Sequence, residues 1–246
     1  MSTLAYDTFG EGAPLVLLHS GGMAAGEWTP YVETFSARYR LIVPDLPGHG
    51  RSRLAPGERL TVSGTAEDVL TLLDTLGVDR AHWLGSSMGG AVALWAALTA
   101  PGRVEKLILF RVGYRSDRAG HAEVERMAEP NTWKLWGLER WMSEQHAPQG
   151  GPEAWHEVTR RVVEAFDPAT TEHAHDLGDL ATIRTPTLII AGDRDPLVPL
   201  NQLVEMYRTI PDADLWIMPH TTHTPGSETW RRHCFESEIL RFLDRT

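Results

Sequence analysis

The stretch that decides the fold is WLGSSMGG, residues 83–90, in which two adjacent serines lie among small residues. Glycine at positions 85 and 89 fits the pattern G-x-S-x-G with Ser87 at its centre. A frame centred on Ser86 would need glycine at positions 84 and 88, which are Leu and Met. The pattern is typical of a sharp strand-to-helix turn that projects a nucleophilic hydroxyl. It therefore predicts Ser87 as the nucleophile and leaves Ser86 as a small residue that the turn tolerates.

The surroundings of this stretch predict the same turn. An apolar run of strand length, 81–86, precedes it, and a small, apolar segment suited to a buried helix follows at 88–100. Similar short apolar runs recur along the chain, and nearly continuous runs of this kind suit parallel strands covered on both faces. A first strand is expected at 4–9, and the further runs span 14–20, 40–46, 104–110, 186–192 and 214–219.

Helical patterns separate these runs. In 62–76 the apolar residues recur every three or four positions, and Gly77 ends the pattern. Later helices are expected at 199–209 and at 228–244, the last opened by Ser227 with Glu228 in its first turn. Strands that alternate with helices predict an α/β fold with a doubly wound, mostly parallel sheet.

One long segment, 112–180, interrupts the alternation because it has no strand-like run. A structureless loop of that length inside a compact domain is improbable, so a mostly helical insertion is expected there. The stretch Gly150-Gly151-Pro152 divides it like a hinge. We predict a core formed by 1–111 and 181–246, with 112–180 as a helical cap.

Composition excludes several classes of function. The chain has 246 residues and a formal net charge of −10, which argues against a nucleic-acid or anionic-membrane partner. A single cysteine, Cys234, permits no internal disulfide and no multi-cysteine metal site. The first residues, MSTLAYDTFGEG, have neither a basic nor an apolar region typical of a signal peptide. We therefore expect a cytoplasmic protein that acts on a small molecule.

A serine nucleophile at neutral pH needs a base, and the base needs an acid to orient it. Two later strands are followed by residues of those types. Asp193 and Asp195 follow the run 186–192, and His220 and His223 follow the run 214–219. Asp117, beyond the strand expected at 104–110, is a further candidate acid. His19 and His49 are interpreted as residues that brace loops, although His49 is also considered for the entrance of the site.

Taken together, these motifs resemble the α/β-hydrolase superfamily, in its serine-nucleophile branch. Gly192-Asp-Arg-Asp195-x-x-x-Pro199 is similar to the acid loop of that family, which implies Asp195 as the acid. Pro219-His-Thr-Thr-His223 is similar to its histidine loop, which implies His223 as the base. Asp45-Leu-Pro-Gly-His-Gly-Arg-Ser52 is similar to its D-x-P-G-x-G-x-S turn. The resemblance covers nearly the whole chain apart from 112–180.

The resemblance also implies an oxyanion hole made of two backbone N–H groups. One belongs to Met88, the residue after the nucleophile, at the start of a helix. The other is expected from the loop His19-Ser20-Gly21-Gly22-Met23, where the residue two after histidine matches Gly21. Ser20 stands where glycine is usual in the family, so Gly22 remains an alternative donor.

An insertion at 112–180 implies a lid over the nucleophile. Trp133, Trp136 and Trp141 fall roughly on one helical stripe, a pattern typical of packing as well as of a pocket wall. We include all three, with Gly22, as candidate pocket residues. Aromatic and methionine side chains would suit an apolar or aromatic substrate.

The sequence predicts a serine hydrolase of the carboxylesterase or lactonase type, acting through an acyl-enzyme on Ser87 and needing no metal or organic cofactor. Carbon–carbon bond hydrolases are a third similar group. Two alternatives stay open on this scaffold. One is a non-hydrolytic enzyme such as a lyase, a cyclase or an acyl transferase, and the other is a non-catalytic ligand-binding protein.

Overall fold

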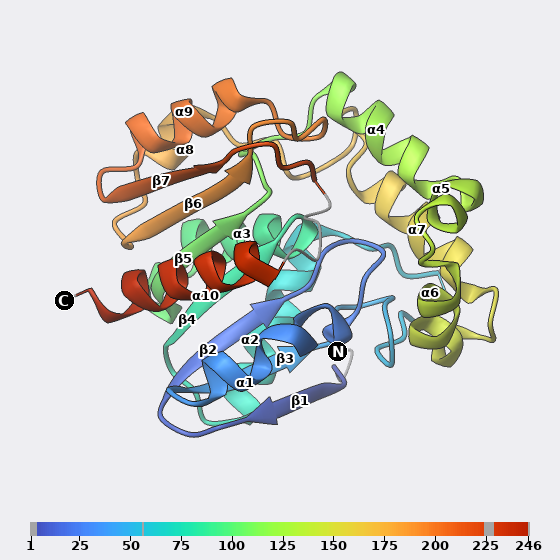
Figure 1. The fold of residues 1–246 in the computed structure, drawn as a ribbon, viewed down its shortest axis with the longest axis horizontal. Coiled ribbons are helices and arrows are strands. Elements are labelled where there is room, and N and C mark those ends of the chain that lie inside the picture. The colour runs from blue at the N-terminus through green and yellow to red at the C-terminus, as the bar shows by residue number, and fades with distance from the viewer. Residues whose placement is uncertain (1–3, 56, 224–228, 246) are drawn as a thin grey trace.

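The computed structural model describes residues 4–55, 57–223 and 229–245, and a seven-stranded sheet forms its centre. The strands stand in the order β1-β3-β2-β4-β5-β6-β7, with β1 antiparallel to β3 and the remaining pairs parallel. The prediction of a doubly wound, mostly parallel sheet is therefore confirmed (Figure 1). The strands are β1 (Tyr6–Phe9), β2 (Ala13–Leu18), β3 (Tyr39–Pro44), β4 (Ala81–Ser86), β5 (Val104–Phe110), β6 (Thr187–Gly192) and β7 (Ala213–Met218).

Successive residues of each strand point to opposite faces of the sheet, and each face is covered by helices. One face packs on α2 (Val62–Thr75), α3 (Met88–Thr99), α8 (Leu177–Leu180) and α9 (Leu200–Thr209). The other packs on η1 (Ala25–Tyr31), α1 (Val32–Ser36) and α10 (Thr229–Asp244). Apolar side chains on both faces explain why the strands are nearly continuous apolar runs rather than alternating ones.

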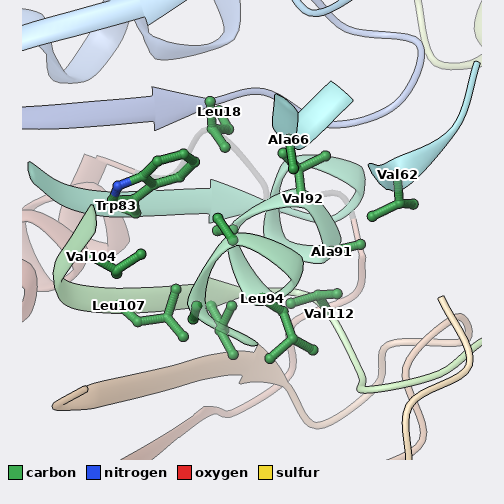
Figure 2. Packing of buried hydrophobic residues seen from close by; sticks show 14 of the residues in the cluster. Leu18, Val62, Ala66, Trp83, Ala91, Val92, Leu94, Val104, Leu107 and Val112 are labelled. Carbon is green, nitrogen blue, oxygen red and sulfur yellow. The ribbon is translucent and has the colours of Figure 1, made fainter. Parts of the chain in front are cut away.

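Helix α3 is the innermost helix and directly follows the nucleophile turn. Its small apolar residues belong to one buried cluster with residues of β2, β4 and β5, and Figure 2 shows the helix with Trp83 and Leu107 of the sheet on one side and Ala66 of α2 on the other. Small residues on this helix let it lie close to the sheet, so the turn that joins β4 to α3 is held rigidly.

Helix α2 shows how local sequence sets the ends of an element. The Thr61 hydroxyl accepts a hydrogen bond from the Gly64 N–H at 3.1 Å, and the chain leaves the helix through Gly77 in the left-handed conformation, with φ of 65°. Both ends agree with the helix expected at 62–76. The last helix, α10, begins at Thr229. Ser227 and Glu228, expected to open that helix, lie outside the described residues.

Between β5 and β6 the chain forms helices, and its described residues add no strand to the sheet there. Figure 1 shows α4 to α7 gathered beyond the carboxyl ends of the parallel strands, where the functional loops of such a sheet lie. Gly150 and Gly151, expected as a hinge, both have positive φ and precede α7. The helices of the insertion are α4 (Arg118–Ala128), α5 (Pro130–Leu135), α6 (Glu139–His146), η3 (Ala147–Gln149) and α7 (Ala154–Ala165), and the short η2 (Pro101–Arg103) lies before β5.

A membrane-spanning helix would need a long, apolar stretch. None of the helices formed by the described residues is both long enough and apolar enough to cross a bilayer.

Candidate active site

Ser87 occupies a strained turn between β4 and α3. Its φ of 52° and ψ of −113° lie in a region that residues with a side chain rarely adopt. The turn is held from both sides, because the Ser87 N–H donates to the Phe110 carbonyl at 2.8 Å and its own carbonyl accepts from Ala91 N–H at 3.0 Å. A Cβ on Gly85 would overlap the Gly89 carbonyl, and one on Gly89 would overlap the Leu18 carbonyl. The two glycines of the motif are therefore required by close backbone approach.

The structure brings Ser87, His223 and Asp195 together in one hydrogen-bonded chain. His223 Nε2 lies 3.0 Å from Ser87 Oγ, and His223 Nδ1 lies 2.8 Å from Asp195 Oδ2. With the Asp195 carboxylate as the acceptor, Nδ1 carries the proton and Nε2 presents a lone pair to the serine hydroxyl. The side chains of His223 and Asp195 are 7% and 0% exposed, so the chain is largely shielded from water.

Backbone amides hold Asp195 in place. One of its oxygens, Oδ1, accepts from Leu197 N–H at 2.9 Å and Val198 N–H at 3.2 Å. The other candidate acids have different partners. Asp193 accepts from the Thr221 N–H, which links the acid loop to the histidine loop. Asp117 begins α4 as its N-cap and accepts from Gly120 N–H.

The candidate oxyanion donors differ in whether their N–H groups already have a hydrogen-bond acceptor. Met88 is the first residue of α3, where a helix offers its N–H no acceptor. The Gly22 N–H donates to His49 Nε2 at 3.1 Å and is therefore already used. Gly21 lies beside Met88, since a Cβ on Gly21 would come within 3.5 Å of the Met88 Cβ. Gly21 and Met88 therefore remain the predicted pair of oxyanion donors.

A group of three buried histidines braces the loop that carries Gly21. The Leu46 N–H donates to His19 Nε2 at 2.9 Å, so the proton of His19 lies on Nδ1, which donates to the Ser20 carbonyl at 2.8 Å. This arrangement agrees with the bracing role expected for His19. His49 binds the Gly22 N–H and is fully buried, and it is not among the residues that line the cavity. Burial lowers the pKa of both rings, so both stay neutral.

The third histidine, His146, comes from α6 of the insertion. Its Nδ1 accepts from the Gly50 N–H at 3.0 Å, so its Nε2 carries the proton and donates to the Gly22 carbonyl at 2.8 Å. Burial lowers the pKa of His146 to about 4. A histidine of the insertion thus fixes the carbonyl next to the candidate oxyanion donor.

The turn Asp45–Ser52 has a structural role. The Asp45 carboxylate accepts from Ala25 N–H at 2.8 Å and from the Arg51 side chain at 2.6 Å. Burial by itself raises the pKa of Asp45, but the hydrogen bonds from Arg51 and Ala25 outweigh it and hold the pKa below its usual value. His220, the other candidate base, adopts a left-handed backbone with φ of 53°, and its carbonyl accepts from Arg231.

Ser87 and His223 lie in the wall of a cavity of about 450 Å³ between the sheet and the inserted helices. Most of its lining is apolar. The core contributes Trp28, Phe110, Leu197, Val198, Met218 and Phe235, and the insertion contributes Val112, Val124, Met127, Trp133, Leu138, Val162 and Phe166. Polar residues of the insertion, Asp117, His121, Thr159 and His173, also reach the wall.

Comparison with known proteins agrees with this geometry. The family model described as alpha/beta hydrolase fold matches residues 13–152, more than half of the chain. The chain belongs to the alpha/beta hydrolase fold family. It is 30% identical to a pimeloyl-(acyl-carrier protein) methyl ester esterase of Aliivibrio salmonicida, over 98% of this chain and 96% of that protein. It is 28% identical to a 2-hydroxy-6-oxo-6-phenylhexa-2,4-dienoate hydrolase of Burkholderia cepacia, over 87% and 82%.

Among solved structures, the enol-lactonase of Burkholderia xenovorans LB400 superposes with a TM-score of 0.77 at 22% identity, over 99% of this chain and 97% of that one. At that identity the likeness establishes the fold. The relatives above, which are hydrolases by name, support a hydrolase enzyme.

The expectation for the cap tryptophans needs a correction. Trp133 lines the cavity of this alpha/beta hydrolase, as does Gly22, but Trp136 and Trp141 are not among its lining residues. Trp136 is 42% exposed, and its ring makes a T-shaped contact with the ring of Trp133. Trp141 packs near Gly26. The expected stripe is broken because α5 ends at Leu135 and α6 begins at Glu139, with Gly137 in a left-handed turn between them.

Sequence reasoning missed Arg111 and Glu27, which also line the cavity of the alpha/beta hydrolase. Arg111 directly follows β5, at the carboxyl end of a central strand, the same position that identified the acid and histidine loops. The signal was therefore present for Arg111. Glu27 lies in η1, a short helix with no distinguishing pattern, so no sequence signal pointed to it.

Proposed function

We propose that the chain is a serine hydrolase that cleaves an ester, lactone or related carbonyl bond in a small apolar or aromatic substrate. The observation that supports it most directly is the hydrogen-bonded chain Ser87–His223–Asp195 in the wall of a mostly apolar cavity. Nucleophile, base and orienting acid are the three parts that acyl transfer through a serine requires.

In the first half of the reaction, Ser87 Oγ attacks the substrate carbonyl while its proton passes to His223 Nε2, 3.0 Å away. Asp195 holds the ring by its Nδ1–H and stabilises the imidazolium that forms. The tetrahedral oxyanion accepts hydrogen bonds from the Gly21 and Met88 N–H groups. His223 then returns the proton to the leaving oxygen, and the carbonyl re-forms as an acyl ester of Ser87.

In the second half, His223 removes a proton from a water molecule, which attacks the acyl ester. The same two amides stabilise the second oxyanion, and collapse returns the proton to Ser87 and releases the acid. The balance is one water consumed for one bond cleaved, and no metal or organic cofactor takes part.

The cavity supports the proposed substrate class. A volume of about 450 Å³ suits a small molecule, and aromatic and aliphatic walls favour an apolar one. Because residues of 112–180 form one wall, we propose that this segment acts as a lid on a core made of 1–111 and 181–246. A mostly apolar cavity of this volume matches a small molecule rather than a nucleic acid or a membrane surface, so the partner we propose is the small-molecule substrate.

A fluorophosphonate probe tests the nucleophile, because it reacts covalently with an activated serine. The wild-type protein should be labelled and Ser87→Ala should not. Ser36→Ala, which removes a serine at the end of α1 outside the cavity, serves as the matched control and should be labelled as wild type. Equal labelling of wild type and Ser87→Ala would remove Ser87 from the mechanism.

Reaction in ¹⁸O-labelled water separates hydrolysis from the alternative reactions on the same scaffold. Hydrolysis places one labelled oxygen in the product acid, since water attacks the acyl-enzyme. A lyase, cyclase or acyl transferase reaction would leave the product unlabelled.

A further inference from the structure

A second buried network lies against the candidate triad, on the side of β5. Arg111 and Glu27 form an ion pair at 2.7 Å, with side chains only 6% and 13% exposed. We propose that this pair positions the oxyanion loop and the histidine loop against the nucleophile turn, and that Arg111 is the positioning residue at its centre. The inference rests on the proposed function, because it assumes that Ser87 and His223 react.

Arg111 contacts all three catalytic segments at once. Its guanidinium donates to Ser86 Oγ at 2.6 Å, in the residue before the nucleophile, and to Ser20 Oγ at 3.1 Å, in the oxyanion loop. It also donates to the backbone carbonyl of His223. A planar group with five N–H donors can make these contacts together, which a lysine ammonium on a flexible stem cannot.

Glu27 fixes the oxyanion loop from the other side. Its Oε2 accepts from the Ser20 N–H at 2.7 Å and its Oε1 accepts from the Ser20 hydroxyl at 2.9 Å. The Ser20 carbonyl is held in turn by Met23 N–H at 3.0 Å and by His19. In a trans peptide the N–H points opposite to the carbonyl, so fixing the Ser20 carbonyl sets the direction of the Gly21 N–H. That N–H is the proposed oxyanion donor.

The network accounts for the departure of this chain from the family pattern. A glycine at position 20 would offer no hydroxyl to either Glu27 or Arg111. The hydroxyl oxygens of Ser20 and Ser86 lie 3.0 Å apart, so the two serines that the family motif does not require meet at the guanidinium. A buried ion pair is seldom more stabilising than apolar residues of the same size, so stability alone does not explain its presence.

The hydrogen bonds of Arg111 distinguish a positioning role from substrate binding. Although Arg111 lines the cavity, four protein groups already accept from its guanidinium: the Ser20 and Ser86 hydroxyls, the Glu27 carboxylate and the His223 carbonyl. Its charge is paired with Glu27 rather than presented to a ligand. A positioning role predicts a loss in kcat at nearly constant KM, because oxyanion contacts form only in the transition state.

The test uses p-nitrophenyl butyrate and the purified full chain, with kcat expressed per active site titrated by the fluorophosphonate. Arg111→Met and Glu27→Gln should each lower kcat by about 10- to 100-fold with KM changed by less than about threefold. Arg111→Lys keeps the charge and should recover little. The matched control is Arg103→Met, which removes an arginine with its own carboxylate and carbonyl partners before β5 and should keep kcat.

Ser20→Gly is the second variant, and it decides the question if the Arg111 variants do not fold. It keeps both charges and restores the glycine usual in the family, and it should lower kcat by about threefold to tenfold. Unchanged kcat per titrated site in Ser20→Gly, or in a folded Arg111→Met, would overturn the inference. Failure of the proposed function itself would be recognised separately, as labelling of Ser87→Ala by the fluorophosphonate.

Discussion

The contact of His146 with the oxyanion loop predicts a specific loss of stability in acid. In the folded chain this ring is fully buried, accepts from Gly50 N–H through Nδ1 and donates to the Gly22 carbonyl through Nε2. A second ring proton would break the Gly50 bond and place a charge in the interior. The substitution His146→Gln keeps one donor and one acceptor at a similar reach but removes the titrating group.

The magnitude follows from the pKa of His146, which burial lowers from 6.5 to about 4. Between these values the unfolded chain binds a proton that the folded chain does not, so stability falls as the pH falls. The loss from this group is about 2 kcal/mol between about pH 7 and about pH 5, and about 3 kcal/mol once the pH is below about 4. Above about pH 7 the group contributes no pH dependence.

Urea unfolding followed by tryptophan fluorescence at about pH 7 and about pH 5 measures this difference. The free energy of unfolding of His146→Gln should fall by about 2 kcal/mol less than that of wild type over the interval. His156→Gln is the matched control, since the His156 side chain on α7 is 40% exposed. The free energy of unfolding of this variant should fall by as much as that of wild type over the same interval. If the free energy of unfolding of His146→Gln falls as much as that of wild type between these two pH values, the assignment of a neutral, buried His146 is refuted.

Three further outcomes are expected. Asp195→Asn should lower kcat for p-nitrophenyl butyrate by about 10⁴-fold while Asp193→Asn stays near wild type, and the reverse result would exchange their roles. Gly89→Ala should lower the free energy of unfolding in urea by about 2 kcal/mol or more, because its Cβ would overlap the Leu18 carbonyl; an unchanged midpoint would contradict that packing. Trp133→Ala should raise KM for an aryl ester by about tenfold through lost apolar contact, whereas Trp136→Ala should leave KM unchanged, and equal effects would count against the assigned cavity wall.

The sheet and the nucleophile turn could be predicted from the sequence because their signals are local. A parallel strand buried on both faces is a short apolar run, and the strand predicted at 104–110 is Val104–Phe110 in the structure. The pairing of Asp195 with His223 is a contact between residues far apart in the chain, yet it was predictable because both follow parallel strands and therefore meet at one edge of the sheet.

The cap and the second network could not be predicted in the same way. A helical stripe assumes one continuous helix, but the turn at Gly137 rotates Trp141 away from the face that Trp133 shares with the cavity. Glu27 and Arg111 meet across 84 residues of chain, and their pairing depends on where η1 settles on the sheet. The place of Arg111 directly after β5 indicates the site, but no sequence pattern indicates Glu27 as its partner.

One deviation from the family pattern nevertheless pointed to this network. Ser20 stands where glycine is usual in the family, and in this chain its hydroxyl lies between Glu27 and Arg111. The loop is therefore held by side-chain hydrogen bonds that a glycine at this position could not make. Ser20→Gly should loosen the loop without removing any group proposed to touch the substrate, and the loss should appear in kcat. A residue that departs from a family motif, as Ser20 does, thus indicates contacts specific to this chain, because such a departure persists where other contacts compensate for it.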